Sequence, residues 1–299
     1  MDPLALTKLQ GLMNLSRGIP EVSVGVIDGP LDLNHPTLHN SKIRTTKESG
    51  YFDCKKASSM SCMHGTFIAG MLVSERGPYT LGICPNCEII IRPVFKEVLD
   101  GSNIYYPSVS TQDLARAIVE VVDSGAKIIN LSLGLTGSSL IKFQELEEAY
   151  DYAFRKRVLV IAAAGNQGSI GHVSLIDHPW VIPVASCDAN GNLDPTSNIG
   201  PSIAKRGLMA PGKDITSSQA GGTYMKLSGT SVAAPFITGT IALLYSIFYE
   251  TTTPQDLVMA IRRDIRRRTL LPPLLNAERS IQVMEDLFSR RRDYVTTVT

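Results

Sequence analysis

The chain has 299 residues, of which 43% are hydrophobic and 19% charged, and its formal net charge is +1. This composition supports a large buried core and excludes an intrinsically disordered chain. A net charge near zero gives no general attraction to nucleic acid or to an anionic membrane, so we expect neither as a partner.

Three further features of the sequence bear on location. No apolar run reaches the ~18 residues that span a bilayer, and the N-terminus lacks the pattern of a secretory signal. The five cysteines are an odd number, which argues against a complete secreted disulfide framework. We therefore expect a cytoplasmic protein, and the sequence leaves its oligomeric state open.

Apolar segments alternate with amphipathic helical segments along most of the chain. A helix is expected over residues 4–17 and an irregular surface segment over 38–61. Strands and helices that alternate at this spacing indicate parallel βαβ units, so we predict an α/β fold with a doubly wound, mainly parallel sheet and helices on both faces. The expected strands are 22–27, 88–95, 127–134, 158–164 and 181–186, and the expected helices are 64–73, 111–124, 142–156, 232–248 and 253–268.

The last part of the chain differs from the rest in composition. Residues 1–270 are expected to form one domain, and residues 271–299 an extension that packs on it or trails from it. Arginines concentrate after residue 261. We interpret them as a solvated helix face, with a docking surface for an acidic partner as the alternative. Residues 290–299 are expected to be a frayed tail or the start of a linker.

Three polar residues stand at the ends of predicted elements. Asp28 ends the first strand, where open α/β sheets place their sites, although Asp-Gly-Pro also forms simple turns. His64 stands at or near a helix start, although a lone histidine is more often structural than catalytic. Ser231 stands at a helix N-terminus that favours negative charge, although Gly-Thr-Ser is also a common helix cap. Pro235 fits the first turn of that helix and would be costly any deeper.

The order of these residues discriminates between kinds of serine hydrolase. Acyl transfer needs a nucleophile, a base that takes its proton and a carboxylate that orients the base. An α/β-hydrolase requires G-x-S-x-G around the serine and the histidine last, whereas here the last histidine is His178. That fold is excluded, and the order aspartate, histidine, serine is that of subtilisin.

Five segments in the same order resemble the motifs of the subtilase family, between about residue 20 and residue 248. Met209-Ala210-Pro211-Gly212 also fits the pattern of that family. The resemblance implies a subtilisin-like fold. The five segments are Val26-Ile27-Asp28-Gly29 with His35-Pro36, His64-Gly65-Thr66 with Ala69-Gly70, Leu131-Ser132-Leu133-Gly134, Ala163-Ala164-Gly165-Asn166, and Gly229-Thr230-Ser231-x-Ala233-x-Pro235.

The resemblance also implies a role for each site residue. Ser231 would attack the scissile carbonyl, His64 would act as general base and then acid, and Asp28 would orient His64. Asn166 would donate to the oxyanion together with the Ser231 backbone N–H. A peptide substrate would lie as an added strand along Leu131, Ser132, Leu133 and Gly134. The first specificity pocket would be walled by Ala162, Ala163, Ala164 and Gly165. No cofactor is expected.

No metal site is expected either. Thr37 stands where the family usually has a calcium-ligating acid after His-Pro, and residues 74–79 lack the oxygen-rich pattern of a tight calcium site. The cysteines leave alternatives open. Cys84 and Cys87 could form a redox pair or half of a zinc site with Cys54 and Cys62, or all four could stay thiols or pair as a disulfide. As a thiol, Cys62 would lie beside the active site.

Two stretches, Gly82-Ile83-Cys84-Pro85-Asn86-Cys87 with Ile91-Arg92-Pro93-Val94-Phe95 and Gly207-Leu208-Met209-Ala210-Pro211-Gly212, resemble the subtilases of cyanobactin-type pathways. That resemblance implies the processing of ribosomally made precursor peptides. Macrocyclising members carry an inserted helical lid, for which the spans between motifs leave little room here. We therefore expect a serine endopeptidase that removes a leader by hydrolysis. The alternatives are a general intracellular degradative subtilase and a catalytically silent peptide-binding module.

Overall fold

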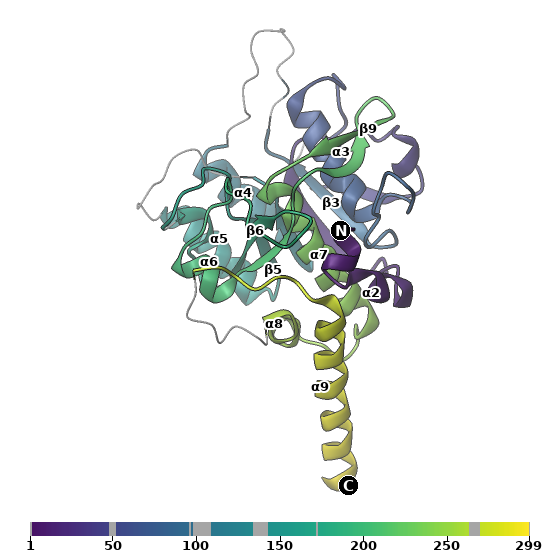
Figure 1. The fold of residues 1–299 in the computed structure, drawn as a ribbon, viewed down its shortest axis with the longest axis vertical. Coiled ribbons are helices and arrows are strands. Elements are labelled where there is room, and N and C mark those ends of the chain that lie inside the picture. Colours follow the sequence, from purple (N-terminus) through teal and green to yellow (C-terminus); the bar gives the residue numbers. More distant parts are fainter. Residues whose placement is uncertain are drawn as a thin grey trace.

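The computed structural model describes residues 2–47, 52–95, 97, 109–133, 143–171, 173–262 and 270–298. At its centre is a seven-stranded sheet in the order β2-β3-β1-β4-β5-β6-β7, with every neighbouring pair parallel (Figure 1). The predicted α/β fold with a doubly wound parallel sheet is confirmed. The strands are β1 Ser23–Asp28, β2 Lys42–Thr45, β3 Glu88–Pro93, β4 Ile128–Leu131, β5 Leu159–Ala163, β6 Val181–Cys187 and β7 Leu208–Pro211.

Helices cover both faces of this sheet, and each face has its own buried cluster. Because side chains alternate along a strand, Leu159 and Ile161 of β5 join one cluster and Val160 and Ala162 join the other. The first cluster includes side chains of α2 Leu9–Leu15, α3 Met60–Val73, α7 Thr230–Ile247 and α8 Pro254–Arg262. The second includes side chains of α4 Thr111–Asp123, α5 Gln144–Arg155 and α6 Pro201–Arg206.

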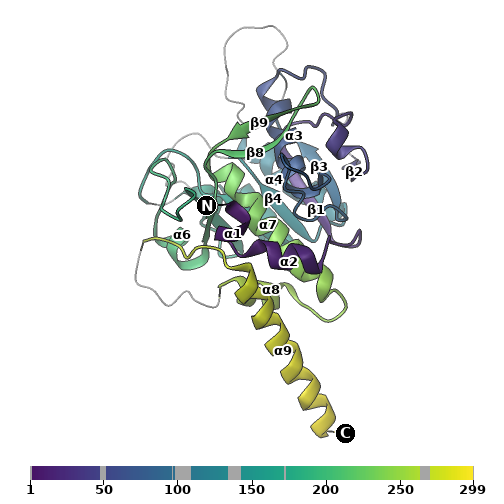
Figure 2. The ribbon, with the colours of Figure 1, turned by 45° about the vertical axis from the view of Figure 1, so that its right-hand side comes forward.

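The remaining described elements are short, with one exception. An antiparallel hairpin of β8 Ile215–Gln219 and β9 Thr223–Leu227 lies apart from the main sheet. The turns η1 Pro36–Leu38 and η2 Ser174–Ile176 and the helix α1 Pro3–Leu6 are single turns. The exception is α9 Ala277–Val298, which points away from the body of the molecule in both views (Figures 1 and 2).

Three boundaries differ from the sequence-based expectation. The helix expected over residues 4–17 is split into α1 and α2 because Lys8 adopts a left-handed conformation, with a φ of 55°. Residues 38–61 are not wholly irregular, since β2 adds an edge strand beside β3. The helix expected to start at or near His64 begins at Met60, where the Ser59 side chain accepts a hydrogen bond from the Cys62 backbone.

The C-terminal residues are more ordered than expected. Instead of a frayed tail, α9 continues to Val298, and the Met284 and Phe288 side chains are buried against the first cluster. Arg291 forms a salt bridge with Asp256 of α8 at 2.7 Å. The expectation of a solvated arginine face is wrong for Arg262, because its Nε and Nη2 atoms are buried; this burial and the neighbouring Arg206 lower its pKa to about 10. Arg263, Arg266, Arg267 and Arg268 lie outside the described residues.

One described helix, α7, is long and apolar enough to cross a bilayer, contrary to the expectation from the sequence. However, 78% of its apolar window is buried inside the fold. The core helix of a globular domain passes the same test of length and composition, so this is weak evidence for a membrane span.

Candidate active site

The candidate site lies at the carboxyl edge of the sheet, where β1 and β4 end side by side. Ile27 of β1 is in register with Leu131 of β4, so Asp28, the last residue of β1, lies beside Ser132, the first residue after β4. The chain continues from β1 toward one edge of the sheet and from β4 toward the other. Such a reversal of strand order opens a crevice in which α/β proteins bind ligands.

Asp28 and His64 form a close pair at this edge. Nδ1 of His64 lies 2.7 Å from Oδ1 of Asp28, and the Gly29 backbone N–H donates to the same oxygen at 2.7 Å. The Asp28 side chain is fully buried, whereas 24% of the His64 side chain is exposed. A Cβ on Gly65 would lie 2.5 Å from the Pro30 carbonyl oxygen, so a glycine here lets α3 approach the end of β1.

The interaction with Asp28 changes the pKa of His64. Burial disfavours the imidazolium, but the charge and the hydrogen bond of Asp28 outweigh it, and the pKa of His64 is raised above its usual value. The second carboxylate oxygen of Asp28 is buried and has no hydrogen-bond partner among the described residues. This geometry suits a histidine that takes up a proton during a reaction and is held in one tautomer by a carboxylate.

Ser231 is the second residue of α7 and lies at the same edge. Its backbone carbonyl accepts a hydrogen bond from Oγ of Ser132 at 2.8 Å, which ties the start of α7 to the end of β4. The preceding Gly229 has a φ of +137°, a conformation that L side chains rarely adopt. The first amides of a helix have no acceptor within it, so the Ser231 N–H is available to an incoming anion.

Asn166 follows β5 and faces the same helix terminus. Its Oδ1 accepts hydrogen bonds from the backbone N–H of Thr230 at 2.8 Å and from the Thr230 hydroxyl at 3.0 Å. These contacts commit the oxygen, so the NH₂ group of this exposed side chain stays free to donate. The Gly165 N–H donates to the Thr230 hydroxyl at 3.1 Å, which further fixes the loop.

Two residues that hold the loop after β5 were not singled out from the sequence. Thr230 bridges Gly165 and Asn166, as described above. Asn198 donates from Nδ2 to the Ala164 carbonyl at 3.0 Å, and its Oδ1 accepts from the Gln167 N–H at 3.1 Å. Thr230 belongs to the Gly-Thr-Ser motif and could have been noticed, but no sequence signal marks Asn198.

The expected substrate-binding segments are partly described. Leu131 ends β4 and Ser132 and Leu133 follow it at the candidate site, whereas Gly134 lies outside the described residues. The alanines 162, 163 and 164 expose at most 2% of their surface, and the Ala162 and Ala164 side chains join the buried cluster under α4 and α5. Their role as the wall of a specificity pocket stays a prediction.

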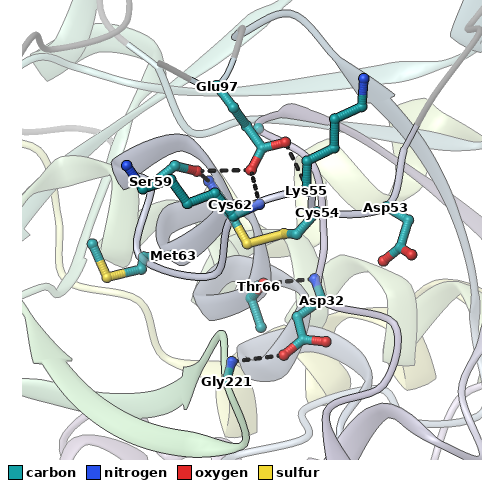
Figure 3. Close-up of a disulfide and its surroundings, with 12 residues drawn as sticks. Asp32, Asp53, Cys54, Lys55, Ser59, Cys62, Met63, Thr66, Glu97 and Gly221 are labelled. Carbon is teal, nitrogen blue, oxygen red and sulfur yellow. Dashed lines mark hydrogen bonds between the residues drawn. A yellow bond between two sulfur atoms is a disulfide. The ribbon is translucent and has the colours of Figure 1, made fainter. Parts of the chain in front are cut away.

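A disulfide lies at the start of the helix that carries His64. Cys54 and Cys62 are bonded, with their Cα atoms 5.7 Å apart (Figure 3). The Glu97 carboxylate accepts hydrogen bonds from the backbone N–H groups of Lys55 and Lys56, both at 2.9 Å. The side chains of Cys54, Cys62 and Glu97 lie close enough together to be considered as a metal site, but the bonded sulfurs are not available as thiolate ligands. The expectation that Cys62 is a thiol beside the active site is therefore wrong.

The other cysteine pair remains reduced. Cys84 and Cys87 are free and fully buried. Their mutual hydrogen bond raises the pKa of Cys84, where burial acts in the same direction, and lowers the pKa of Cys87. A shared zinc site with Cys54 and Cys62 is excluded, because those two cysteines are already bonded to each other.

Arg76 lies in the loop where calcium was considered, and its guanidinium gathers backbone carbonyls. Nε donates to the Gly82 oxygen at 3.0 Å and Nη1 to the Met13 oxygen at 2.7 Å. Nη2 donates to the Ser16 and Ile83 oxygens, both at 3.1 Å. A side-chain cation therefore joins the end of α2 to the connection between α3 and β3.

Thr37, which stands where a calcium-ligating acid was considered, contacts a serine hydroxyl and a histidine ring. Its hydroxyl lies 2.7 Å from Oγ of Ser218 and 2.8 Å from Nδ1 of His35. The expectation of no tight calcium site stays a prediction, and these contacts agree with it.

Comparison with known proteins gives consistent matches. Residues 20–278 match the model of the Subtilase family. A thermophilic serine proteinase of Bacillus sp. (strain AK1) is 34% identical over 235 residues, which cover 78% of this chain and 54% of that protein. This chain thus spans about half the length of that relative. Subtilisin DY of Bacillus licheniformis is 31% identical over 231 residues, 75% of this chain and 77% of that protein.

Among solved structures, the prenylagaramide maturation protease PagA superposes with a TM-score of 0.79 at 31% identity, covering 92% of this chain and 98% of that one. The patellamide maturation protease PatA superposes with a TM-score of 0.75 at 28% identity, covering 90% and 98% of the two chains.

Proposed function

Because the chain belongs to the subtilase family, we propose that it is a serine endopeptidase that uses Asp28, His64 and Ser231. The observation that carries this proposal is the buried Asp28 carboxylate 2.7 Å from Nδ1 of His64, at the sheet edge where α7 presents Ser231. A peptide-binding module without catalysis would need neither this pair nor the free NH₂ of Asn166.

In this proposal each group carries out one step of the reaction. Nδ1–H of His64 donates to Asp28, which leaves Nε2 as the acceptor for the Ser231 hydroxyl proton. Ser231 Oγ then attacks the substrate carbonyl, and the oxyanion accepts hydrogen bonds from Asn166 and from the Ser231 N–H. His64 returns the proton to the leaving amine. Water, activated in the same way, releases the acyl group from Ser231.

For the substrate we propose a ribosomally made precursor peptide whose leader is removed. The support is the likeness to PagA, a maturation protease by its title, at 31% identity over 92% of this chain. The peptide backbone would pair with Leu131, Ser132 and Leu133. Because the Ser132 hydroxyl is committed to the Ser231 carbonyl, only backbone groups of this residue remain for the substrate.

The experiment that tests this proposal is labelling with a fluorophosphonate probe, on the wild type and on Ser231→Ala, with a mixed peptide library digested in parallel. We expect labelling only in the wild type and a narrow set of cuts, each with one heavy-oxygen atom incorporated from labelled water. Broad cuts would favour a degradative protease, and cyclic products without that atom would indicate ring closure. Absence of labelling in folded wild type would refute the active enzyme.

The cytoplasmic location also stays a proposal. It is supported by the odd number of cysteines and by the three buried thiols, whereas the Cys54–Cys62 bond is more typical of an oxidising compartment. Fractionation of cells under conditions that trap thiols would decide between the two.

A further inference from the structure

Pro235 lies deeper in its helix than expected. The helix α7 begins at Thr230, so Pro235 is in its second turn. In an α-helix the carbonyl of residue i accepts from the N–H of residue i+4, and proline has no N–H. The partner of the Ser231 carbonyl would be residue 235, so Pro235 leaves this carbonyl without a helical donor. The hydroxyl of Ser132 takes that place at 2.8 Å.

Ser132 is the end of a buried chain of hydrogen bonds. Its Oγ accepts from Nδ2 of Asn130 at 2.7 Å, and Oδ1 of Asn130 accepts from Oγ1 of Thr238 at 2.8 Å. Asn130 and Thr238 are fully buried, and Ser132 is 2% exposed. This series of hydrogen bonds therefore begins at Thr238 of α7, passes through Asn130 of β4 and Ser132, and ends at Ser231 near the start of α7.

The direction of every bond in this chain follows from its last member. A carbonyl only accepts, so Ser132 must spend its single proton on Ser231. The Ser132 oxygen can then only accept, which turns the NH₂ group of Asn130 toward it. The Asn130 oxygen therefore faces Thr238, and Thr238 must donate. These positions are shielded from bulk solvent, so the loss of one donor leaves a buried polar atom without its partner.

We propose that Thr238 and Asn130, acting through Ser132, position Ser231 for catalysis. This inference rests on the proposed role of Ser231 as the nucleophile. The carbonyl carbon of Ser231 is bonded to the Cα that carries the side chain, so a hydrogen bond that fixes the carbonyl also fixes the direction of the Cα–Cβ bond, and Oγ is attached to that Cβ. None of the three residues takes a proton from the substrate; they are positioning residues.

The chain offers a matched control on the same helix. Thr240 is as fully buried as Thr238, but its hydroxyl donates to the Phe236 carbonyl within α7. Thr238→Val and Thr240→Val therefore remove the same atom from the same helix, and only the first one breaks the connection to Ser231. Thr238→Ser keeps the donor and serves as the rescue variant.

The experiment measures fluorophosphonate labelling rates, and kcat and KM on a peptide that the wild type cuts. Thr238→Val should lower the labelling rate and kcat about tenfold or more, since small misplacements of reacting groups are costly, with KM and the acidic limb of the pH profile unchanged. Thr238→Ser should restore most of the rate. Thr240→Val should keep the wild-type rate even where its melting temperature falls equally.

Wild-type rates in Thr238→Val, or equal losses in both valine variants, would overturn the proposal. Crystal structures of the two variants provide a readout that does not depend on activity. Thr238→Val should lengthen the contact between Ser132 Oγ and the Ser231 oxygen, and Thr240→Val should not. If the wild type fails to label, the proposed function fails, whereas these structures still test the positioning.

Discussion

The two halves of the candidate site are held in place by different means. His64 lies near the start of α3, where the Cys54–Cys62 disulfide and the Glu97 carboxylate tie down a surface loop. Ser231 lies at the start of α7, whose neutral hydrogen bonds are buried in the core. Water competes with hydrogen bonds at a surface and not in a dry core. A helix start near solvent therefore gains from a covalent tie, and one in the core does not require it.

The largest expected effect is a loss of kcat on disrupting the Asp28–His64 pair. Asp28→Asn keeps the shape of the side chain but loses the carboxylate that fixes the tautomer of His64. We expect kcat to fall about 10⁴-fold, as for the equivalent change in another serine protease. Steady-state kinetics on a cut peptide would measure it. Asp32→Asn is the control, because that nearby carboxylate accepts from the Gly221 N–H and not from a histidine. Near-normal kcat in Asp28→Asn would contradict the assignment.

The second largest effect should come from a substitution of Asn166, which lies beside Ser231. Asn166→Leu should lower kcat about 10²–10³-fold with little change in KM, a magnitude that comes from a subtilisin. Because leucine also removes the contacts to Thr230, Asn166→Asp is the sharper variant, since it keeps an acceptor for Thr230 and loses the NH₂ group. Single-turnover kinetics should show a loss in the aspartate variant at least as large as in the leucine variant, because its carboxylate also repels the oxyanion. An aspartate variant as active as the wild type would show that Asn166 only holds the loop.

Removal of the Cys54–Cys62 disulfide should destabilise the fold. In the double variant Cys54→Ser, Cys62→Ser, the free energy of unfolding should fall by about 2–3 kcal/mol, the loop entropy expected for so short a loop. Denaturant unfolding measures this change. Reductant should destabilise the wild type and leave the double variant unaffected. Thiol titration of the denatured wild type should find three of its five cysteines free, and five free thiols would refute the disulfide.

The smallest effect is a pH dependence of the Asp28–His64 pair. The pKa of His64 is raised in the folded state, so the pair stabilises the fold fully below the unfolded pKa of ~6.5 and loses this contribution as pH rises through the folded pKa. Catalysis needs the neutral histidine and therefore has the opposite pH dependence. The acidic limb of kcat/KM should lie above pH ~6.5. A limb below that value would contradict the raised pKa.

Much of this arrangement could be predicted from the sequence because its signals are local. The inner strands are apolar runs, and Asp28, His64, Asn166 and Ser231 each stand in a short motif. The edge strand β2 escaped notice because Lys42–Thr45 is polar and none of its residues is fully buried. The break between α1 and α2 escaped notice because Lys8 takes a conformation that usually marks glycine.

The features that sequence reasoning missed depend on which residues the fold brings together and on where an element begins. Asn130 and Thr238 are 108 residues apart, and nothing in either neighbourhood shows that they meet. Pro235 was expected in the first turn of its helix, where proline is tolerated. Because α7 begins at Thr230, Pro235 lies in the second turn and leaves the Ser231 carbonyl without a helical donor. The bond between Cys54 and Cys62 was one of several open pairings until the fold placed their Cα atoms 5.7 Å apart.

The guanidinium of Arg76 has a consequence for how this protein depends on its surroundings. A junction held by a bound ion gains stability with the logarithm of the ion concentration, and a chelator or dilution takes that gain away. Arg76 is part of the chain, so its local concentration at the Met13, Ser16, Gly82 and Ile83 carbonyls is constant. The junction between the N-terminal helices and the body is therefore buffered against the ionic composition of the solution.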